Sequence, residues 1–118
     1  MPGSQTSASG RFADDSAFRR AVESTLHELL DQVDEIDFDL DPRLTPGNLQ
    51  VVFEHDGSTF VLSQQTPTHE LWLSANLTAW HFRKVGGEWV ERDSGAAMLG
   101  ILGELFSGKV GEPITFSL

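Results

Sequence analysis

Residues 48–75, which read NLQVVFEHDGSTFVLSQQTPTHELWLSA, contain the pattern that decides the fold. From Asn48 to Glu54 apolar side chains alternate with polar ones, which is typical of a strand with one buried face. Asp56-Gly57 is a hairpin turn signal, and Thr59 to Gln64 returns as the partner strand. Glu70 to Ala75 repeats the alternation after a proline, so the stretch predicts three successive antiparallel strands.

The segment that follows continues this pattern and then changes to a helical one. Ala79 to Val85 and Glu88 to Glu91 predict a second hairpin across Gly86-Gly87. Beyond it, apolar residues recur at helical spacing: Met98, Leu99, Leu102, Leu105 and Phe106. We expect this helix to begin at Asp93 or Ser94 and to stop at Gly108, with the tail from Pro113 to Phe116 extended against the core.

The N-terminal part supplies another helix. Met1 to Ala13 is rich in Ser, Gly and Thr, and we interpret it as a disordered tail before a single domain, residues 14–118. Apolar residues at three- and four-residue spacing predict an amphipathic helix from about Ser16 to Val33 or Asp34, which any of residues 14–16 could cap. From Ile36 to Asp41 the period changes to two, which predicts a further strand.

A helix, an antiparallel meander and a second helix therefore follow one another along the chain. Pro42 and Pro46-Gly47 mark a loop inside the first part of the meander. This order predicts an α+β fold, a two-layer α/β sandwich in which two helices pack on one face of an antiparallel sheet. The other face of the sheet would then meet solvent.

The composition limits the classes of function. The chain has 118 residues, no cysteine and a formal net charge of -10, from 18 acidic and 8 basic residues. The lack of thiols excludes disulfides and thiolate metal sites. Because such a surface is repelled by nucleic acid and by anionic lipid, we expect neither a nucleic acid nor a membrane as partner. With no apolar run of membrane-spanning length and no secretory signal, we expect a cytoplasmic protein.

The acidic residues are unevenly distributed. Seven of them lie between positions 28 and 41 with no Lys or Arg among them, and we call this set the acidic ridge: Glu28, Asp31, Asp34, Glu35, Asp37, Asp39 and Asp41. Like charges three and four residues apart repel on one helix face, and the C-terminal end of a helix favours cations. Aspartate is also a poor strand residue. Each penalty is only about a few tenths of a kcal/mol, but all have the same sign, which favours a function over a merely solvated acidic face.

The chemistry of the acidic ridge leaves several ligands open. Carboxylate oxygens are hard ligands that suit iron, calcium, magnesium or manganese. The glycine and terminal Glu of an EF-hand loop are missing, and His27 is the only histidine beside the ridge. We expect weak, overlapping cation sites, and the same charge would also attract a basic protein surface.

Trp72 is a second candidate for recognition. Strand alternation puts it on the face opposite Leu71 and Leu73, which is the solvent face of the predicted sheet. Tryptophan is enriched where proteins bind one another, so Trp72 is a plausible anchor for a partner. The alternative is that a loop or the tail covers it.

Residues 60–67, FVLSQQTP, and 69–74, HELWLS, resemble the frataxin family, and its bacterial CyaY members in particular. The family pattern is a strand, a Gln, one residue and Pro, then a strand with Trp-Leu-Ser or Trp-Leu-Ala. Other similar stretches are Trp80-His81-Phe82, the turn at 86–89, Arg92-Asp93-Ser94-Gly95 before the last helix, and the ending at 113–116. The resemblance extends from about Ser16 to the C-terminus and implies the same two-layer sandwich.

The resemblance also implies a role in iron–sulfur cluster assembly in the bacterial cytoplasm. In the family, the acidic ridge of the first helix and first strand binds ferrous and ferric iron and contacts a basic patch on the cysteine desulfurase. The residues that correspond by position are Glu28, Asp31, Asp34, Asp37, Asp39 and Asp41. Gln65 and Trp72 match sheet-face residues that meet the iron–sulfur scaffold protein.

We therefore expect an iron-binding regulatory adaptor that is not an enzyme. One alternative is a ferroxidase-like iron chaperone, since eukaryotic relatives have been assigned that activity, although nothing here resembles the Glu and Glu-x-x-His set of a di-iron site. Another alternative, independent of the resemblance, is an acidic protein that mimics nucleic acid in order to occupy a basic partner.

Overall fold

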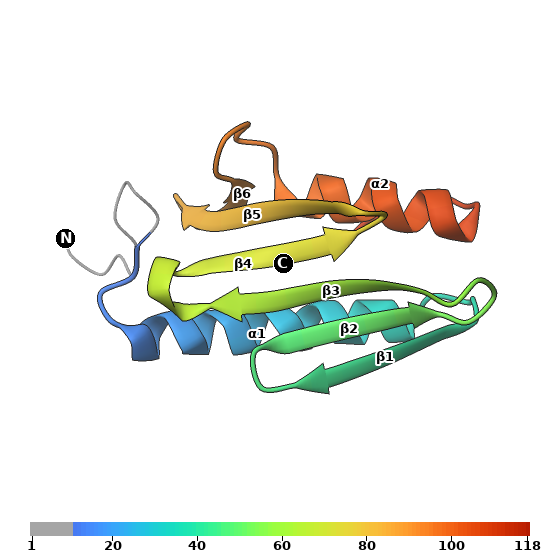
Figure 1. The fold of residues 1–118 in the computed structure, drawn as a ribbon, viewed down its shortest axis with the longest axis horizontal. Helices are drawn as coiled ribbons and strands as arrows, with labels where there is room; N and C mark the ends of the chain where they lie inside the picture. Colours follow the sequence, from blue (N-terminus) through green and yellow to red (C-terminus); the bar gives the residue numbers. More distant parts are fainter. Residues whose placement is uncertain (1–10) are drawn as a thin grey trace.

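Six strands form one antiparallel sheet in which neighbours in sequence are also neighbours in space (Figure 1). The computed structural model describes residues 11–118. The strands are β1 (Leu40–Thr45), β2 (Asn48–Phe53), β3 (Ser58–Gln65), β4 (Glu70–Ala75), β5 (Thr78–Val85) and β6 (Glu88–Glu91). Three of these, β2, β3 and β4, are the strands that residues 48–75 predict.

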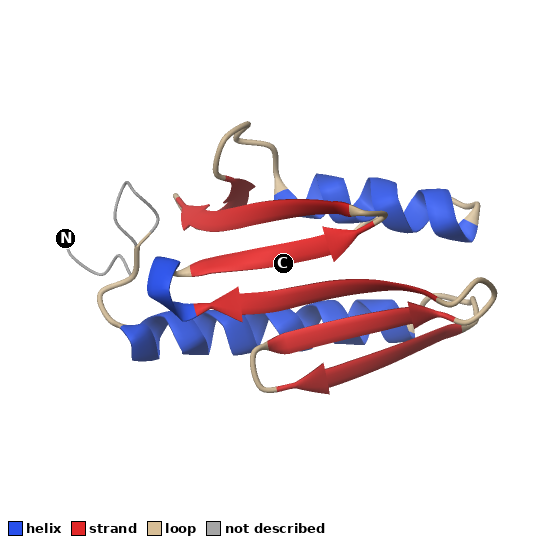
Figure 2. Cartoon of the chain, in the orientation of Figure 1, coloured by secondary structure: helices blue, strands red, loops and turns tan. Residues whose placement is uncertain are grey.

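Two helices flank the sheet in sequence and share one of its faces in space. α1 (Asp15–Asp34) precedes the sheet, α2 (Met98–Val110) follows it, and the 3-10 turn η1 (Thr66–Thr68) joins β3 to β4. Figure 2 shows the sheet as one layer, with both helices behind it. The predicted α+β sandwich is therefore confirmed. In the described part of the chain neither helix is long and apolar enough to cross a membrane.

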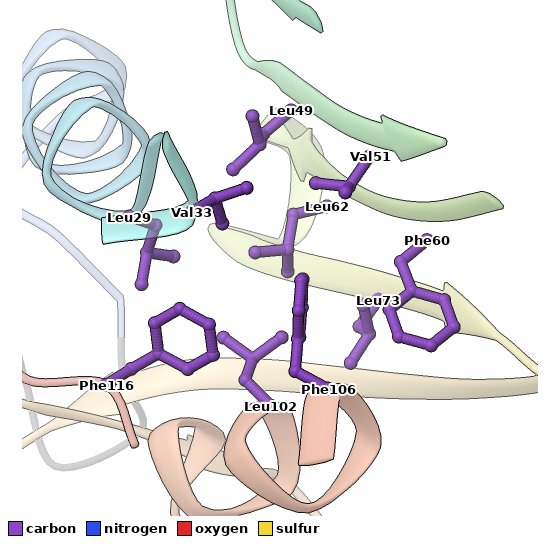
Figure 3. Close-up of a pocket in the computed structure, with 10 residues that line it drawn as sticks. All are labelled: Leu29, Val33, Leu49, Val51, Phe60, Leu62, Leu73, Leu102, Phe106 and Phe116. Atoms are coloured by element: carbon purple, nitrogen blue, oxygen red, sulfur yellow. The ribbon is translucent and has the colours of Figure 1, made fainter. Parts of the chain in front are cut away.

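The core lies between the two layers. α1 buries one apolar stripe, which includes Phe18, Leu26 and Val33, because these residues recur on one side of the helix. β2, β3 and β4 bury every second residue against it. A cavity of about 20 Å³ remains where ten apolar side chains from α1, α2, the three strands and the C-terminal segment meet (Figure 3).

The C-terminal segment joins the two helices. The side-chain amide of Gln32 on α1 donates to the Ser117 carbonyl at 2.6 Å and accepts from the Ser117 N–H at 3.0 Å. The Ile114 N–H donates to the Ser107 hydroxyl of α2 at 2.8 Å, and Phe116 packs edge-on against Phe106. The prediction that this tail lies against the core is confirmed.

The strand predicted from Ile36 to Asp41 is confirmed only for its last two residues and is wrong for residues 36–39, because β1 begins at Leu40. Two successive tight turns precede it, in which the Phe38 N–H donates to the Ile36 carbonyl and the Leu40 N–H to the Phe38 carbonyl, at 3.0 and 2.8 Å. Ile36 and Phe38 still pack against the core. The segment keeps the two-residue alternation of a strand but satisfies its backbone locally, as the low strand preference of aspartate allows.

Pro42 lies inside β1 and not in the loop that we predicted for it. β1 is an edge strand, where a proline can face solvent without removing a ladder hydrogen bond. Pro46-Gly47 does form the turn, between β1 and β2. Gly47 has a φ of 73°, and a Cβ atom there would lie 2.4 Å from Gln64, so the turn requires glycine.

The predicted ends of the second helix are also wrong. α2 begins at Met98 and runs past Gly108 to Val110, where Gly111 with a φ of 83° ends it. Residues 92–97 form a loop instead of a first helical turn. The Glu91 carboxylate accepts the N–H groups of Ser94 and Asp93 at 2.9 and 3.0 Å, which holds the pKa of Glu91 below its usual value.

The ordered domain begins earlier than residue 14. Phe12, which we assigned to the tail, is buried in the core, and its N–H donates to Nδ1 of the buried His69 at 2.9 Å. Nε2 of His69 then donates to the Asp15 carboxylate at 2.8 Å, which lowers the pKa of Asp15. The remainder of the predicted tail, residues 1–10, lies outside the described residues. Of the three candidate caps at residues 14–16, Asp14 is the one that caps α1. Its carboxylate accepts from the Ala17 N–H at 2.8 Å.

Candidate functional site: an acidic ridge and an open sheet face

The acidic ridge begins on the last two turns of α1. Glu28, Asp31 and Asp34 are exposed there, and Glu35 is the exposed C-terminal capping residue of the helix. The last turn of α1 carries no basic residue, so the negative end of the helix dipole meets further negative charge. The helical part of the ridge therefore lies where the sequence predicts it.

The ridge continues through the two tight turns before β1. Asp37 and Asp39 are exposed, whereas Ile36 and Phe38, which alternate with them, pack against the core. The Asp39 carbonyl accepts from the Glu54 N–H at 3.0 Å, which attaches this part of the ridge to the end of β2. The aspartates keep the exposure that the predicted strand implies.

Asp41 is the one ridge residue with a cationic partner among residues 11–118. The Arg43 guanidinium donates to the Asp41 carboxylate through Nε at 3.0 Å and through the Nη2 nitrogen at 2.7 Å. Both residues lie on β1, two positions apart, and therefore on the same face. Strand parity could have identified this pair, but we predicted a loop after Asp41. Arg43 makes the ridge less negative at this end.

The acidic ridge forms a surface and not a cage. Within residues 11–118 no three His, Asp or Glu side chains converge closely enough to hold one metal ion. Its carboxylates are the oxygen donors that hard cations prefer, and iron fits this donor chemistry. An arrangement of separate exposed carboxylates suits weak binding that water and several side chains share, and it suits attraction of a basic protein.

The second candidate surface is the sheet face that the helices leave uncovered, which we call the open face. Trp72 lies on it, opposite Ser63 of β3 and His81 of β5 in the strand register. Gln65 follows Ser63 by two residues and shares this face, with its side-chain amide nitrogen 3.5 Å from the Ser63 hydroxyl. The structure thus brings Gln65 and Trp72 together but places them apart from the helical part of the ridge.

Trp72 is half-buried, which is less exposed than we expected. Its ring centroid lies 4.4 Å from that of His81. Its indole Nε1–H donates to the Glu70 carboxylate at 2.9 Å. Both of these contacts come from side chains of the sheet itself.

Sequence reasoning missed Glu70 and Arg92 on this face. Glu70 precedes Trp72 by two residues on the same strand, so parity placed them side by side, but a glutamate between His69 and Leu71 gave no sign of being buried. Arg92 comes from the loop after β6, and its ion pair with Glu70 at 3.2 Å crosses β5. No local pattern predicts that contact.

The chain matches a known family. A model of the frataxin-like domain matches residues 11–112, and this chain belongs to that family. The similar proteins include the iron–sulfur cluster assembly protein CyaY of Neisseria meningitidis serogroup C, which is 31% identical over 100 residues, covering 85% of this chain and 92% of the relative. CyaY of Vibrio cholerae serotype O1 is 30% identical over 100 residues, covering 85% and 95%.

Solved structures agree on the architecture. Frataxin from Psychromonas ingrahamii superimposes with a TM-score of 0.81 at 22% identity, covering 89% of this chain and 99% of that one. Trimeric frataxin from the yeast Saccharomyces cerevisiae, solved in complex with ferrous iron, gives a TM-score of 0.67 at 27% identity, covering 77% and 86%. The predicted resemblance is therefore confirmed at the level of family and fold.

Proposed function

We propose that this protein takes part in iron–sulfur cluster assembly as an iron-binding adaptor and not as an enzyme. In this proposal the acidic ridge binds Fe2+ or Fe3+ as cargo and docks on a basic patch of a cysteine desulfurase. Gln65 and Trp72, on the open face, contact an iron–sulfur scaffold protein.

The observation that carries the proposal is the exposure of the acidic ridge without compensating charge. Six of its seven carboxylates have no ion pair within residues 11–118, and only Asp41 is paired. Uncompensated carboxylates at a helix C-terminus cost stability, so a cation or a basic partner that binds there gains from relieving the repulsion. The names of the bacterial relatives and the ferrous complex of a yeast relative support iron as that cation.

Binding of iron should be weak and shared among several carboxylates. No three ligands converge among the described residues, so an incoming ion keeps much of its water shell. An iron titration followed by NMR tests this directly. We expect the amide signals of residues 28–41 to change first, and changes that begin elsewhere would contradict an iron site on the ridge.

Docking on the desulfurase is tested by reversing charge on the ridge. The double variant Asp31→Lys with Asp37→Lys should weaken binding of purified desulfurase by about tenfold or more, because two attractions become repulsions. The matched control is Asp93→Lys with Glu104→Lys, two exposed carboxylates outside the ridge that change the net charge equally. An equal loss in the control would mean that only total charge matters, and unchanged affinity in the ridge variant would refute docking there.

The ferroxidase alternative makes a different prediction. A catalyst should oxidise Fe2+ with turnover, at a rate above that of an equally acidic protein without this fold. For an adaptor we expect no excess over that control, since exposed carboxylates only hold iron that dioxygen oxidises unaided. Measured turnover that the Asp31→Lys and Asp37→Lys variant abolishes would favour the enzyme.

A further inference from the structure

Glu70 is a charged side chain in an unusual place. Its residue is only 6% exposed although it lies on the open face of the sheet. A buried carboxylate is costly unless its oxygens are hydrogen-bonded, so its partners show what it does. Oε1 accepts from the Trp72 indole Nε1–H at 2.9 Å, and the Arg92 guanidinium donates to Oε1 and Oε2 at 3.2 and 3.4 Å.

Arg92 is itself anchored so that it reaches Glu70. Its backbone N–H donates to the His81 carbonyl of β5 at 2.9 Å, which holds the start of the loop after β6 against that strand. From there its side chain meets the carboxylate on β4, the next strand. The same His81 packs its ring against Trp72, so these contacts converge on the indole.

We propose that Glu70 and Arg92 are positioning residues that hold the Trp72 indole in one orientation on the open face, ready for a partner protein. This inference rests on the proposed function, in which Trp72 contacts the scaffold protein. A side chain that is already held in its bound orientation loses less conformational freedom on binding. The hydrogen bond to Glu70 and the ring of His81 supply that constraint without covering the indole completely.

If Glu70 had only a structural role, Glu70→Ala would lower the stability of the protein without a specific effect on the Trp72 indole. The two roles separate in a double-mutant cycle with Trp72→Phe, which keeps an aromatic ring but has no N–H to donate. We expect Glu70→Ala to raise the Kd for the purified scaffold protein roughly three- to tenfold, from the restored freedom of the indole. In the Trp72→Phe background the same change should have little effect on Kd.

A measurement without any partner tests the positioning itself. In the free protein the Trp72 indole N–H should exchange slowly with water, and Glu70→Ala should accelerate that exchange while the backbone spectrum keeps its folded dispersion. Arg92→Ala should act in the same direction but less, because the carboxylate remains to accept from the indole. Glu104→Ala, which removes an exposed carboxylate of α2, is the control and should change neither the exchange rate nor Kd.

The outcomes distinguish this inference from the proposal on which it rests. If Trp72→Ala leaves the scaffold Kd unchanged, the proposed role of Trp72 fails, and the positioning has no binding purpose. If Trp72→Ala weakens binding but Glu70→Ala changes neither indole exchange nor Kd, the scaffold surface stands and the positioning inference is overturned. Should Glu70→Ala prevent folding, Glu70→Leu provides the same exchange measurement with a side chain closer in size to glutamate that cannot accept from the indole.

Discussion

The Lys109 ammonium lies 2.7 Å from the Asp56 carboxylate, and this ion pair attaches the last turn of α2 to the turn between β2 and β3. The Lys109 side chain is mostly buried and its Nζ is also 5.7 Å from the centroid of the Phe53 ring. The hydrogen bond from Lys109, and after it those from Ser58, hold the pKa of Asp56 well below its usual range. The contact links sequence positions 53 residues apart at the end of the sheet that also carries the tight turns of the acidic ridge.

This ion pair should make stability depend on pH. Because the pKa of Asp56 is lower in the folded protein than in the unfolded chain, its contribution is fully present above the unfolded value, about 3.9 for aspartate, and is lost as the pH falls through the folded value. We expect the difference in unfolding free energy between the natural protein and Asp56→Asn to shrink below about pH 4. Denaturant titrations at several pH values measure it. In a Lys109→Gln background the pH dependence should become smaller, because only the hydrogen bonds from Ser58 remain, and an unchanged pH dependence there would exclude the ion pair as its main cause.

The small core cavity should accept one more methylene group. Val51 lines it from β2, and we expect Val51→Ile to raise the free energy of unfolding by up to about 0.8 kcal/mol, the value of one buried methylene. Val61→Ile on the open face is the control, because it adds the same group outside the core and should change little. Destabilisation by Val51→Ile would show that the cavity is too rigid or misshapen to accept the group.

Replacement of Leu77, in the turn between β4 and β5, by glycine should raise the stability of the protein. Leu77 has a φ of 63° and is fully exposed, so its side chain contributes strain without packing. Relief of the left-handed strain, about 1–2 kcal/mol, exceeds the added flexibility of glycine in the unfolded chain, about 0.5–1 kcal/mol. Thermal unfolding of Leu77→Gly should show a higher Tm. Asn76→Gly should gain less, since asparagine tolerates its own φ of 52° better, and an equal gain at both sites would refute the explanation from strain.

Stability and iron binding should respond in opposite directions to one change on the acidic ridge. Asp34→Lys places a cation at the negative end of α1, where none exists, and should raise the free energy of unfolding by about 0.3–1 kcal/mol. It should also weaken iron binding, measured by titration of the same variant. Glu104→Lys, inside α2 and away from the ridge, should change both quantities little. A parallel loss of stability and iron affinity would contradict the view that the ridge carries an electrostatic penalty.

The sheet was predictable wherever burial followed a strict alternation. The bounds of β4 and β6 agree with the prediction, because a turn signal stands on each side of an alternating run. The pattern at Ile36 and Phe38 is equally regular, yet those residues form tight turns, since alternation reports which side is buried and not which atoms are hydrogen-bonded. Phe12 was missed for another reason: one aromatic residue in a polar stretch has no period, and its contacts include the distant residues His69 and Trp89.

For the acidic ridge and the open face, the sequence predicted which charged residues are exposed better than it predicted which side chains they contact. The exposure of Asp31 and Asp37 follows from position on a helix and from alternation, both of which are local. The pairing of Asp41 with Arg43 depended on knowing that the strand continues through a proline. The Arg92 contact with Glu70 depends on how a loop folds back over β5, which no local pattern contains.

Pro42 in β1 bears on how copies of this protein behave toward one another. An exposed edge strand is a template on which another chain can add a strand, the first step toward fibrils or precipitates. On β1 the proline removes one N–H donor, and the neighbouring Asp41 and Arg43 add charge and hydration to the same edge. Addition of a strand from another chain to β1 is thus disfavoured. In a crowded solution, the sheet edge beside the acidic ridge is therefore protected against aggregation.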